Sequence, residues 1–189
     1  MSVDTLSTVF CWVVFLLYWW LMSRKVKSTA YAQSSAARSF YLFFLLLGFV
    51  LLYAPVASIG PLGYQIIPVS QRYGTIGAVI SLLGVWFAIW ARKTLGDNWS
   101  GNVTFKKGHE LIQSGPYKIV RHPIYTGFEL CFLGAAITIG QLKGFVGLAI
   151  IFFNHMQKIN LEEEIMKKQF PGQYEDYSKR VKRLIPFVF

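Results

Sequence analysis

Two groups of polar residues, well separated along the chain, carry side chains that could together bind a charged organic ligand. Arg121, His122 and Tyr125 form the first group, and the acidic run 162–164 forms the second. A carboxylate accepts charge-assisted hydrogen bonds from an ammonium group, and the face of a tyrosine ring attracts a cation. Each group alone has an ordinary explanation, as a membrane-surface arginine or a solvated acidic face. Together they predict a site for a ligand that carries an amine, hydroxyl groups and an aromatic ring.

The first group lies where a long polar loop meets an apolar segment. Residues 93–121 are polar and punctuated by glycine, and a connection of that length in a small protein usually has a function. Pro123 suits the first turn of a helix, where its missing N–H is not needed. We therefore expect a helix to begin at Pro123, with His122 at its cap and close to the membrane surface.

The elements that must position these residues are membrane helices. Hydrophobic residues make up 54% of the 189-residue chain and charged residues only 15%, whereas about a quarter of a typical soluble domain is charged. A bilayer core of ~30 Å needs roughly 20 apolar residues in a helix. The nearly uncharged runs are residues 6–22, 40–59, 75–91, 125–139 and 142–153. The last two are shorter and separated by a tight turn, so they suit either a membrane hairpin or a buried one. The chain is predicted to be all-α, a polytopic membrane protein of about five transmembrane helices.

The net charge of +10 could suggest a nucleic-acid partner, but its distribution favours a membrane topology. Basic residues crowd the segments after the first, third and fifth apolar runs, and each of the two other connections carries one. This alternation is the positive-inside pattern. It predicts that the N-terminus lies outside, that loop 92–123 and the C-terminus are cytoplasmic, and that no nucleic acid is bound. The residues before the first run are not basic, which disfavours a signal peptide.

The segment after the fifth run predicts two further helices. Asn160 can cap the first, with Glu163 completing a capping box. Pro171 and Gly172 break that helix, and a short second one carries Tyr174. We expect one integrated domain with two parts: residues 1–93 provide three transmembrane helices, and residues 94–189 form the catalytic region. The two cysteines fall inside apolar runs and predict neither a disulfide framework nor a metal site.

Six short motifs follow one another in the second half of the chain. They are Leu-Gly-Asp-Asn-Trp-Ser at 95–100, Gly-His-Glu-Leu-Ile at 108–112, Ser-Gly-Pro-Tyr at 114–117, Arg-His-Pro-Ile-Tyr-Thr-Gly at 121–127, Glu-Glu-Glu at 162–164 and Arg-Leu-Ile-Pro-Phe at 183–187. In these motifs residues 95–187 resemble the isoprenylcysteine carboxyl methyltransferase family. Each motif alone is a weak signal, but their order and spacing over half of the chain are specific, whereas the N-terminal half matches in hydropathy alone.

The resemblance implies S-adenosyl-L-methionine as the cofactor and a lipophilic small molecule or a lipidated protein as the substrate, in contact with membrane lipids. It implies that Glu163 takes the ammonium group of the cofactor. Arg121, His122 and Tyr125 are the candidate catalytic residues. Arg121 could hold an anionic substrate or the cofactor carboxylate, or it could be a membrane-surface arginine. The other cofactor contacts carried over by motif are Thr104, where the alignment is looser, and His109, Glu110, Leu111, Ile112, Tyr117, His122, Pro123, Ile124 and Tyr125.

The sequence departs from the family at one position. Family members that act on prenylated protein C-termini carry an arginine five residues before the last glutamate of the acidic run. In this chain Ile159 occupies that position, with Lys158 beside it. This departure disfavours prenylcysteine as the substrate. The alternatives are a methyltransferase of the same fold for thiols, amines or phospholipid headgroups, a sterol-reductase-like enzyme with a nicotinamide cofactor, and a membrane scaffold without catalysis.

Overall fold

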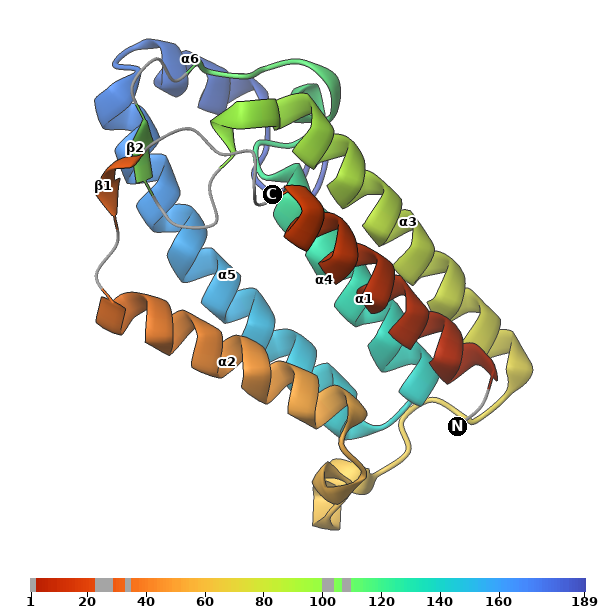
Figure 1. Cartoon of the computed structure of the whole chain (residues 1–189). Coiled ribbons are helices and arrows are strands. Elements are labelled where there is room, and N and C mark those ends of the chain that lie inside the picture. Colours follow the sequence, from red (N-terminus) through yellow and green to blue (C-terminus); the bar gives the residue numbers. More distant parts are fainter. Residues whose placement is uncertain (1–2, 23–28, 33–34, 100–103, 107–109) are drawn as a thin grey trace.

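The protein, described here from a computed structural model, is a bundle of long helices. The structure describes residues 3–22, 29–32, 35–99, 104–106 and 110–189. Figure 1 shows the long helices running side by side, with short elements at both ends of the bundle. The long helices are α1 (Val3–Met22), α2 (Ser35–Tyr53), α3 (Gln71–Leu95), α4 (Pro123–Ile139) and α5 (Leu142–Gln169).

The helices have the length and the surface of membrane-spanning segments. At 1.5 Å per residue they extend about 26 to 42 Å, which matches a hydrocarbon core of ~30 Å. By length and composition, α2 and α3 each hold a clear candidate span, and α1 and α4 hold shorter apolar stretches. Large apolar side chains such as Phe10, Leu46, Trp86 and Phe153 are exposed on the outside of the bundle. The prediction of an all-helical, polytopic membrane fold is confirmed, with one small two-stranded ribbon added.

Small residues let α3 and α4 approach closely. A β-carbon added to Gly84 would lie 2.6 Å from the backbone oxygen of Gly127, and one added to Gly127 would lie 2.6 Å from the oxygen of Gly84. One turn away, the hydroxyl of Ser81 donates to the backbone oxygen of Cys131. Membrane helices associate largely through such close packing, because lipid tails provide no hydrophobic drive between them. The contact fixes α4, and therefore the start of α4 at Pro123, against α3.

Aromatic rings fill the space where α1, α2 and α4 meet. The ring centroid of Trp12 lies 4.6 Å from that of Phe132 and 4.8 Å from that of Phe49. Phe15 packs edge-on against Phe128 at 4.5 Å. Such tilted and edge-on pairs are favourable beyond the area that they bury. This cluster attaches α1 and α2 to the α4 side of the bundle.

Short elements group the connections at the two ends. β1 (Thr29–Ala32), which follows α1, pairs antiparallel with β2 (Thr104–Lys106), which follows α3. The 3₁₀ helices η3 (Gly96–Asn98) and η4 (Gly115–Lys118) and the helix α6 (Gln173–Arg180) belong to the same end (Figure 1). At the opposite end, η1 (Pro55–Ala57) and η2 (Gly60–Gly63) adjoin the α4–α5 turn, where Lys143 Nζ donates to the backbone oxygen of Ala54 at 2.9 Å. The basic segments therefore share one end of the bundle.

The C-terminal helices differ in one respect from the prediction. Asn160 does not cap a separate helix, because α5 continues without interruption from Leu142 to Gln169. An exposed asparagine inside a helix costs only about 0.7 kcal/mol relative to alanine, and no proline or glycine separates residues 153 and 160. The predicted break at Pro171 and Gly172 is confirmed, since α5 ends at Gln169 and α6 begins at Gln173. The acidic run is thus part of α5, beyond the apolar run of residues 142–153.

Candidate functional site

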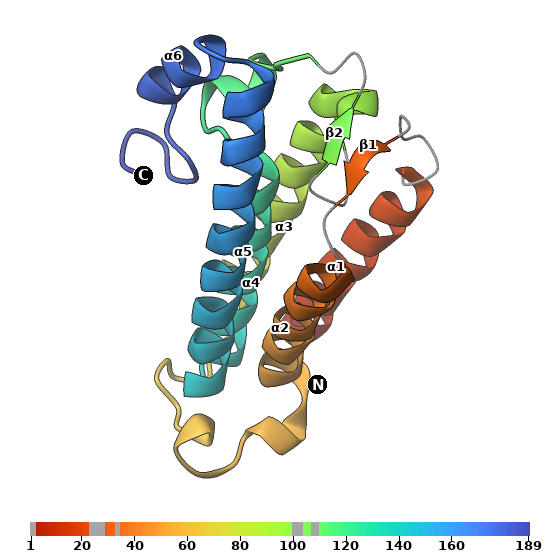
Figure 2. The ribbon, with the colours of Figure 1, turned by 90° about the vertical axis from the view of Figure 1, so that its left-hand side faces the viewer.

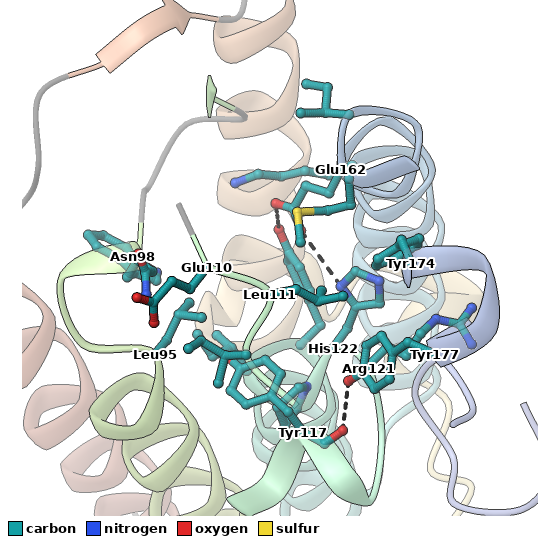
Figure 3. Close-up of a pocket in the computed structure, with 18 of the residues that line it drawn as sticks. Leu95, Asn98, Glu110, Leu111, Tyr117, Arg121, His122, Glu162, Tyr174 and Tyr177 are labelled. Carbon is teal, nitrogen blue, oxygen red and sulfur yellow. Dashed lines mark hydrogen bonds and ion pairs between the residues drawn. The ribbon is translucent and has the colours of Figure 1, made fainter. Parts of the chain in front are cut away.

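A cavity of about 340 Å³ lies at the end of the bundle that carries the basic segments, within the range of roughly 300–1,000 Å³ typical of small-molecule sites. The extended segment 110–114, η4 and the first turn of α4 form one wall, and α5 with α6 forms the other (Figure 3). α1, α2 and the end of α3 complete it. The N-terminal part of the chain contributes Trp19 from α1, Tyr41 from α2, Leu95 at the end of α3, Asn98 from η3 and Trp99 directly after η3.

One face of α5 provides two of the charged side chains that line the cavity. Lys158, Glu162 and Met166 follow one another at four-residue spacing and all line it. The hydroxyl of Tyr125 donates to Oε1 of Glu162 at 2.6 Å, and Nδ1 of His122 lies 3.7 Å from Oε2. Lys158 Nζ lies 4.4 Å from the ring centroid of Tyr41. The cavity therefore holds an acid and a base one helical turn apart, among aromatic rings.

The neighbouring face of α5 points into the protein interior. Ile159 is completely buried against Tyr125 and Leu184. Glu163, one turn further on, is 3% exposed and does not line the cavity. Lys158 and Glu162 therefore point into the cavity and Ile159 and Glu163 do not, because consecutive helical residues point about 100° apart. The predicted role of Glu163 toward the cofactor stays a prediction. An arginine at position 159 would enter the core and could not hold a ligand in this cavity.

Glu163 is the centre of a buried ionic cluster. Nε and Nη2 of Arg121 donate to its Oε1 at 3.0 and 2.7 Å, and those of Arg183 donate to its Oε2 at 3.1 and 2.8 Å. Nε2 of His122 lies 3.1 Å from Oε1. Burial alone would raise the pKa of Glu163, but the hydrogen bonds from His122, Arg121 and Arg183 outweigh it and hold the pKa well below its usual range. Both carboxylate oxygens are thus already satisfied by the protein.

Arg121 is fully engaged in the same cluster. Its remaining nitrogen, Nη1, donates to the backbone oxygen of Ser178 at 3.1 Å and to that of Val181. The side chain borders the cavity, but every guanidinium nitrogen has a protein acceptor. These contacts tie Arg121 to Glu163 and to the C-terminal segment and use four of its five N–H groups. The role of Arg121 toward an anionic ligand stays a prediction.

The C-terminal segment closes the cavity through backbone contacts with residues 120–122. The N–H of Arg121 donates to the oxygen of Lys182 at 2.7 Å, and that of His122 donates to the oxygen of Arg183 at 3.0 Å. The hydroxyl of Tyr177 donates to the backbone oxygen of Tyr117 at 2.6 Å (Figure 3). This bond holds α6 against η4, and Tyr174 and Tyr177 of α6 form the part of the cavity lining that we call the roof.

A second pair of ionisable residues joins α4 and α5 behind the aromatic side chains that line the cavity. Nδ1 of His155 is 2.6 Å from Oε1 of Glu129, and the His155 side chain is completely buried. Its ring centroid lies 5.0 Å from that of Tyr125 and 5.5 Å from that of Phe128, both of which line the cavity. Ionisable residues inside a membrane helix bundle are usually paired in this way. The pair therefore supports the positions of Tyr125 and Phe128 in the cavity lining.

Most of the predicted site residues meet in this cavity. The acid Glu110 lies on the side opposite Glu162, close to Asn98 (Figure 3). His109 lies outside the described residues, and of Thr104 only the backbone is described, as part of β2. Within the acidic run the sequence analysis selected Glu163 and not Glu162, and it gave Lys158 no role in the site. The four-residue spacing of Lys158 and Glu162 is a signal that could have found them. The predicted residues that line the cavity are Glu110, Leu111, Ile112, Tyr117, Arg121, His122, Pro123, Ile124 and Tyr125.

The fold and the cavity together define an integral membrane protein with a small-molecule site at one end of its helix bundle. The chain belongs to the phospholipid methyltransferase family, whose model matches residues 73–173, which is more than half of the chain. This match and the relatives described next confirm the resemblance predicted from the motifs.

The curated relatives are isoprenylcysteine methyltransferases. Protein-S-isoprenylcysteine O-methyltransferase B of Arabidopsis thaliana is 32% identical over 81 residues, 42% of this chain and 41% of the relative. The enzyme of Schizosaccharomyces pombe is 30% identical over 119 residues, 61% of this chain and 50% of the relative. The chain thus spans about half the length of these relatives.

A solved structure has the same fold. It is that of the eukaryotic intramembrane Ras methyltransferase, isoprenylcysteine carboxyl methyltransferase, and it aligns with a TM-score of 0.67 at 23% identity. The alignment covers 95% of this chain and 63% of that structure. The whole arrangement of α1 to α6 therefore has a counterpart in a known membrane protein.

Proposed function

We propose that this protein is a membrane-embedded, S-adenosylmethionine-dependent methyltransferase whose acceptor is an anionic group on a lipophilic or lipidated substrate. One observation carries the proposal. In a chain of a methyltransferase family, a single cavity joins the carboxylate of Glu162, the ammonium group of Lys158 and several aromatic rings. The catalytic part would be residues 94–189, completed by Trp19 and Tyr41 of the N-terminal helices.

The residues present fit the cofactor. Glu162 lines the cavity, and its Oε2 accepts no hydrogen bond of normal length among the described residues, so it can accept one from an ammonium group. Glu110 on the opposite side suits hydroxyl groups. The rings of Tyr117 and Tyr125 suit a sulfonium cation. Glu162 therefore replaces Glu163 as our candidate for binding the amine of the cofactor.

The acceptor side is supported by Lys158. The sequence disfavoured prenylcysteine because Ile159 stands where other family members carry an arginine. In the structure, however, position 158 is the one that faces the cavity, and Lys158 provides a cation there. A lysine provides a point charge for an anion, although without the planar fork of arginine. An isoprenylcysteine-type carboxylate is therefore again a suitable acceptor.

The reaction makes modest demands on the protein. S-adenosylmethionine, when bound, supplies an electrophilic methyl group on its sulfonium sulfur. A carboxylate acceptor carries no proton on its attacking oxygen, so the site needs no general base. Lys158 would hold the carboxylate in line, and Glu162 would hold the amine. Orientation of this kind can contribute about 7–11 kcal/mol. Tyr174 and Tyr177 in the roof would keep water away from the reacting groups.

Calorimetry tests this function directly. The detergent-purified protein should bind S-adenosylmethionine and should not bind a nicotinamide cofactor. It should then transfer labelled methyl groups to a farnesylcysteine analogue. Binding of a nicotinamide cofactor alone would overturn the proposal in favour of a reductase, and binding of neither would favour a scaffold.

A phospholipid amine is a second candidate acceptor, favoured by the match to the phospholipid methyltransferase family. The same assay with phosphatidylethanolamine vesicles separates the two acceptors. On the charge pattern we also propose that the N-terminus lies outside and that the cavity and the C-terminus face the cytoplasm.

Changing Lys158 should impair use of the anionic acceptor. Lys158→Met keeps the apolar stem but removes a hydrogen bond to a charged group, worth about 1.5–3 kcal/mol, so KM for the farnesylcysteine analogue should rise roughly 10- to 150-fold. Cofactor affinity should change little, and Lys158→Arg should restore most of the activity. The neighbouring Gln157→Met, at an exposed position, is the matched control. An unchanged KM in Lys158→Met would remove Lys158 from the acceptor site.

A further inference from the structure

The last residues of the chain form an apolar turn outside the membrane helices. Phe187 is 95% exposed, Val188 71% and Ile185 51%, and Phe189 is also exposed. A contiguous group of exposed apolar side chains is unusual on a water-facing surface and marks an interaction site. None of these four side chains belongs to the core clusters of the described residues.

The turn is a defined structure. The N–H groups of Leu184 and Ile185 donate to the backbone oxygen of Phe189 at 2.7 and 2.6 Å, and the N–H of Phe189 donates back to the oxygen of Ile185 at 3.0 Å. Phe187 has φ of 65°, the only positive φ at a non-glycine residue in the described part of the chain. A bulky residue in this region is strained. The backbone thus presents the Phe187 side chain outward at an energetic cost.

The position of the turn suits a membrane surface. In Figures 1 and 2 the chain descends from α6 toward the bundle, so that its end lies nearer the membrane helices than α6 does. The descending chain packs against the bundle, because Leu184 contacts Tyr125 and Ile159 in a buried cluster. The turn therefore directly follows a residue that is packed against α4 and α5.

The charges beside the turn favour an anionic surface. Arg180 and Lys182 are exposed just before the turn. Lys179 is also exposed, but it pairs with Asp176 at 3.0 Å. Basic residues next to a membrane attract anionic headgroups, and aromatic side chains are enriched at the level of the headgroups.

We propose that residues 185–189 dock into the headgroup region of an anionic lipid bilayer, with Phe187 and Val188 inserted and Arg180 and Lys182 beside the phosphates. The docked turn would anchor the adjoining segment 182–184. That segment is bonded to the cavity wall through Arg121, His122 and the side chain of Thr126, whose hydroxyl donates to the oxygen of Leu184 at 2.8 Å. Lipid contact thereby holds the roof of the cavity in place, whatever reaction the cavity performs.

Fluorescence quenching tests the docking. An environment-sensitive thiol dye is attached to Phe187→Cys, or to Val188→Cys as a second site, in protein reconstituted into phosphatidylcholine–phosphatidylglycerol vesicles. The native cysteines Cys11 and Cys131 are buried, which directs the dye to the introduced thiol. The matched control is Gln173→Cys, at an exposed position on α6.

The expected result is several-fold stronger quenching of the Phe187 and Val188 dyes than of the Gln173 dye by a lipid whose nitroxide lies near the headgroup. Iodide in the water should quench the two turn sites several-fold less than the control. Omitting phosphatidylglycerol, or introducing Arg180→Gln with Lys182→Gln, should weaken the lipid quenching. Iodide quenching of the turn sites equal to that of Gln173 would overturn the proposal, and insensitivity to the anionic lipid would overturn its electrostatic part.

To exclude an effect of the dye, hydrogen exchange compares the unlabelled protein with Phe187→Ser/Val188→Ser in the same vesicles. The amides of residues 184–189 should exchange several-fold faster in the double variant. Equal exchange rates would show that the native side chains do not hold the turn at the bilayer.

Discussion

Replacing Glu163 with glutamine should lower the free energy of unfolding by about 3 kcal/mol, because removing one partner of a buried ion pair leaves an uncompensated charge. Glu163 accepts four hydrogen bonds from Arg121 and Arg183, and an amide could satisfy only part of them. We expect the lower end of the roughly 3–5 kcal/mol usual for breaking a buried ion pair, because the Arg183 side chain remains 30% exposed to solvent. Thermal unfolding in a fixed detergent measures the effect, and the exposed Glu164→Gln is the control.

The same substitution predicts a dependence on pH. The ionised Glu163 stabilises the folded state, and its pKa is lower in the folded than in the unfolded protein. Its contribution is therefore complete above the unfolded pKa of about 4.3 and declines as the pH falls toward the lower, folded value. The difference in free energy of unfolding between wild type and Glu163→Gln should therefore narrow as the pH falls below about 4.3. A difference that stays constant or widens in acid would contradict the ionic role of Glu163.

Replacing Glu162 with glutamine should leave the fold almost intact and weaken the binding of the cofactor. The lost hydrogen bond to a charged group is worth about 1.5–3 kcal/mol, so Kd for S-adenosylmethionine should rise roughly 10- to 150-fold. Titration calorimetry on the two variants makes the comparison. Glu162→Gln should change affinity much more than unfolding temperature, and Glu163→Gln should do the opposite.

The opposite pattern would be informative. If Glu163→Gln loses cofactor affinity at unchanged stability while Glu162→Gln binds normally, the ionic cluster opens on binding and Glu163 contacts the ligand as the motif first suggested. If neither variant loses affinity, the amine of the cofactor is held elsewhere, and Glu110 is the next acid in the cavity to test.

Hydropathy was sufficient to predict the helical membrane fold. A helix that crosses a bilayer must satisfy its backbone internally and cover itself with apolar side chains, so each span leaves an uninterrupted apolar run in the sequence. The start of α4 was equally predictable, because Pro123 can occupy only a few positions in a helix. The motifs around residues 110–112, 117 and 121–125 were local enough to indicate the cavity wall that they form.

The roles within the acidic run depended on the tertiary structure. Glu162, Glu163 and Glu164 are chemically identical and adjacent, and the sequence does not say which way α5 is rotated. Packing of Ile159 against Leu184 and Tyr125 fixes that rotation, and it turns Lys158 and Glu162 into the cavity and Glu163 toward the two arginines. Arg183 comes from a segment twenty residues further on, and only folding brings its charge to Glu163. The sequence by itself determined which residue types gather at this end of the bundle. The packing of α5 decided which acid lines the cavity and which one lies in the buried ionic cluster, because a rotation by one residue moves a side chain by about 100°.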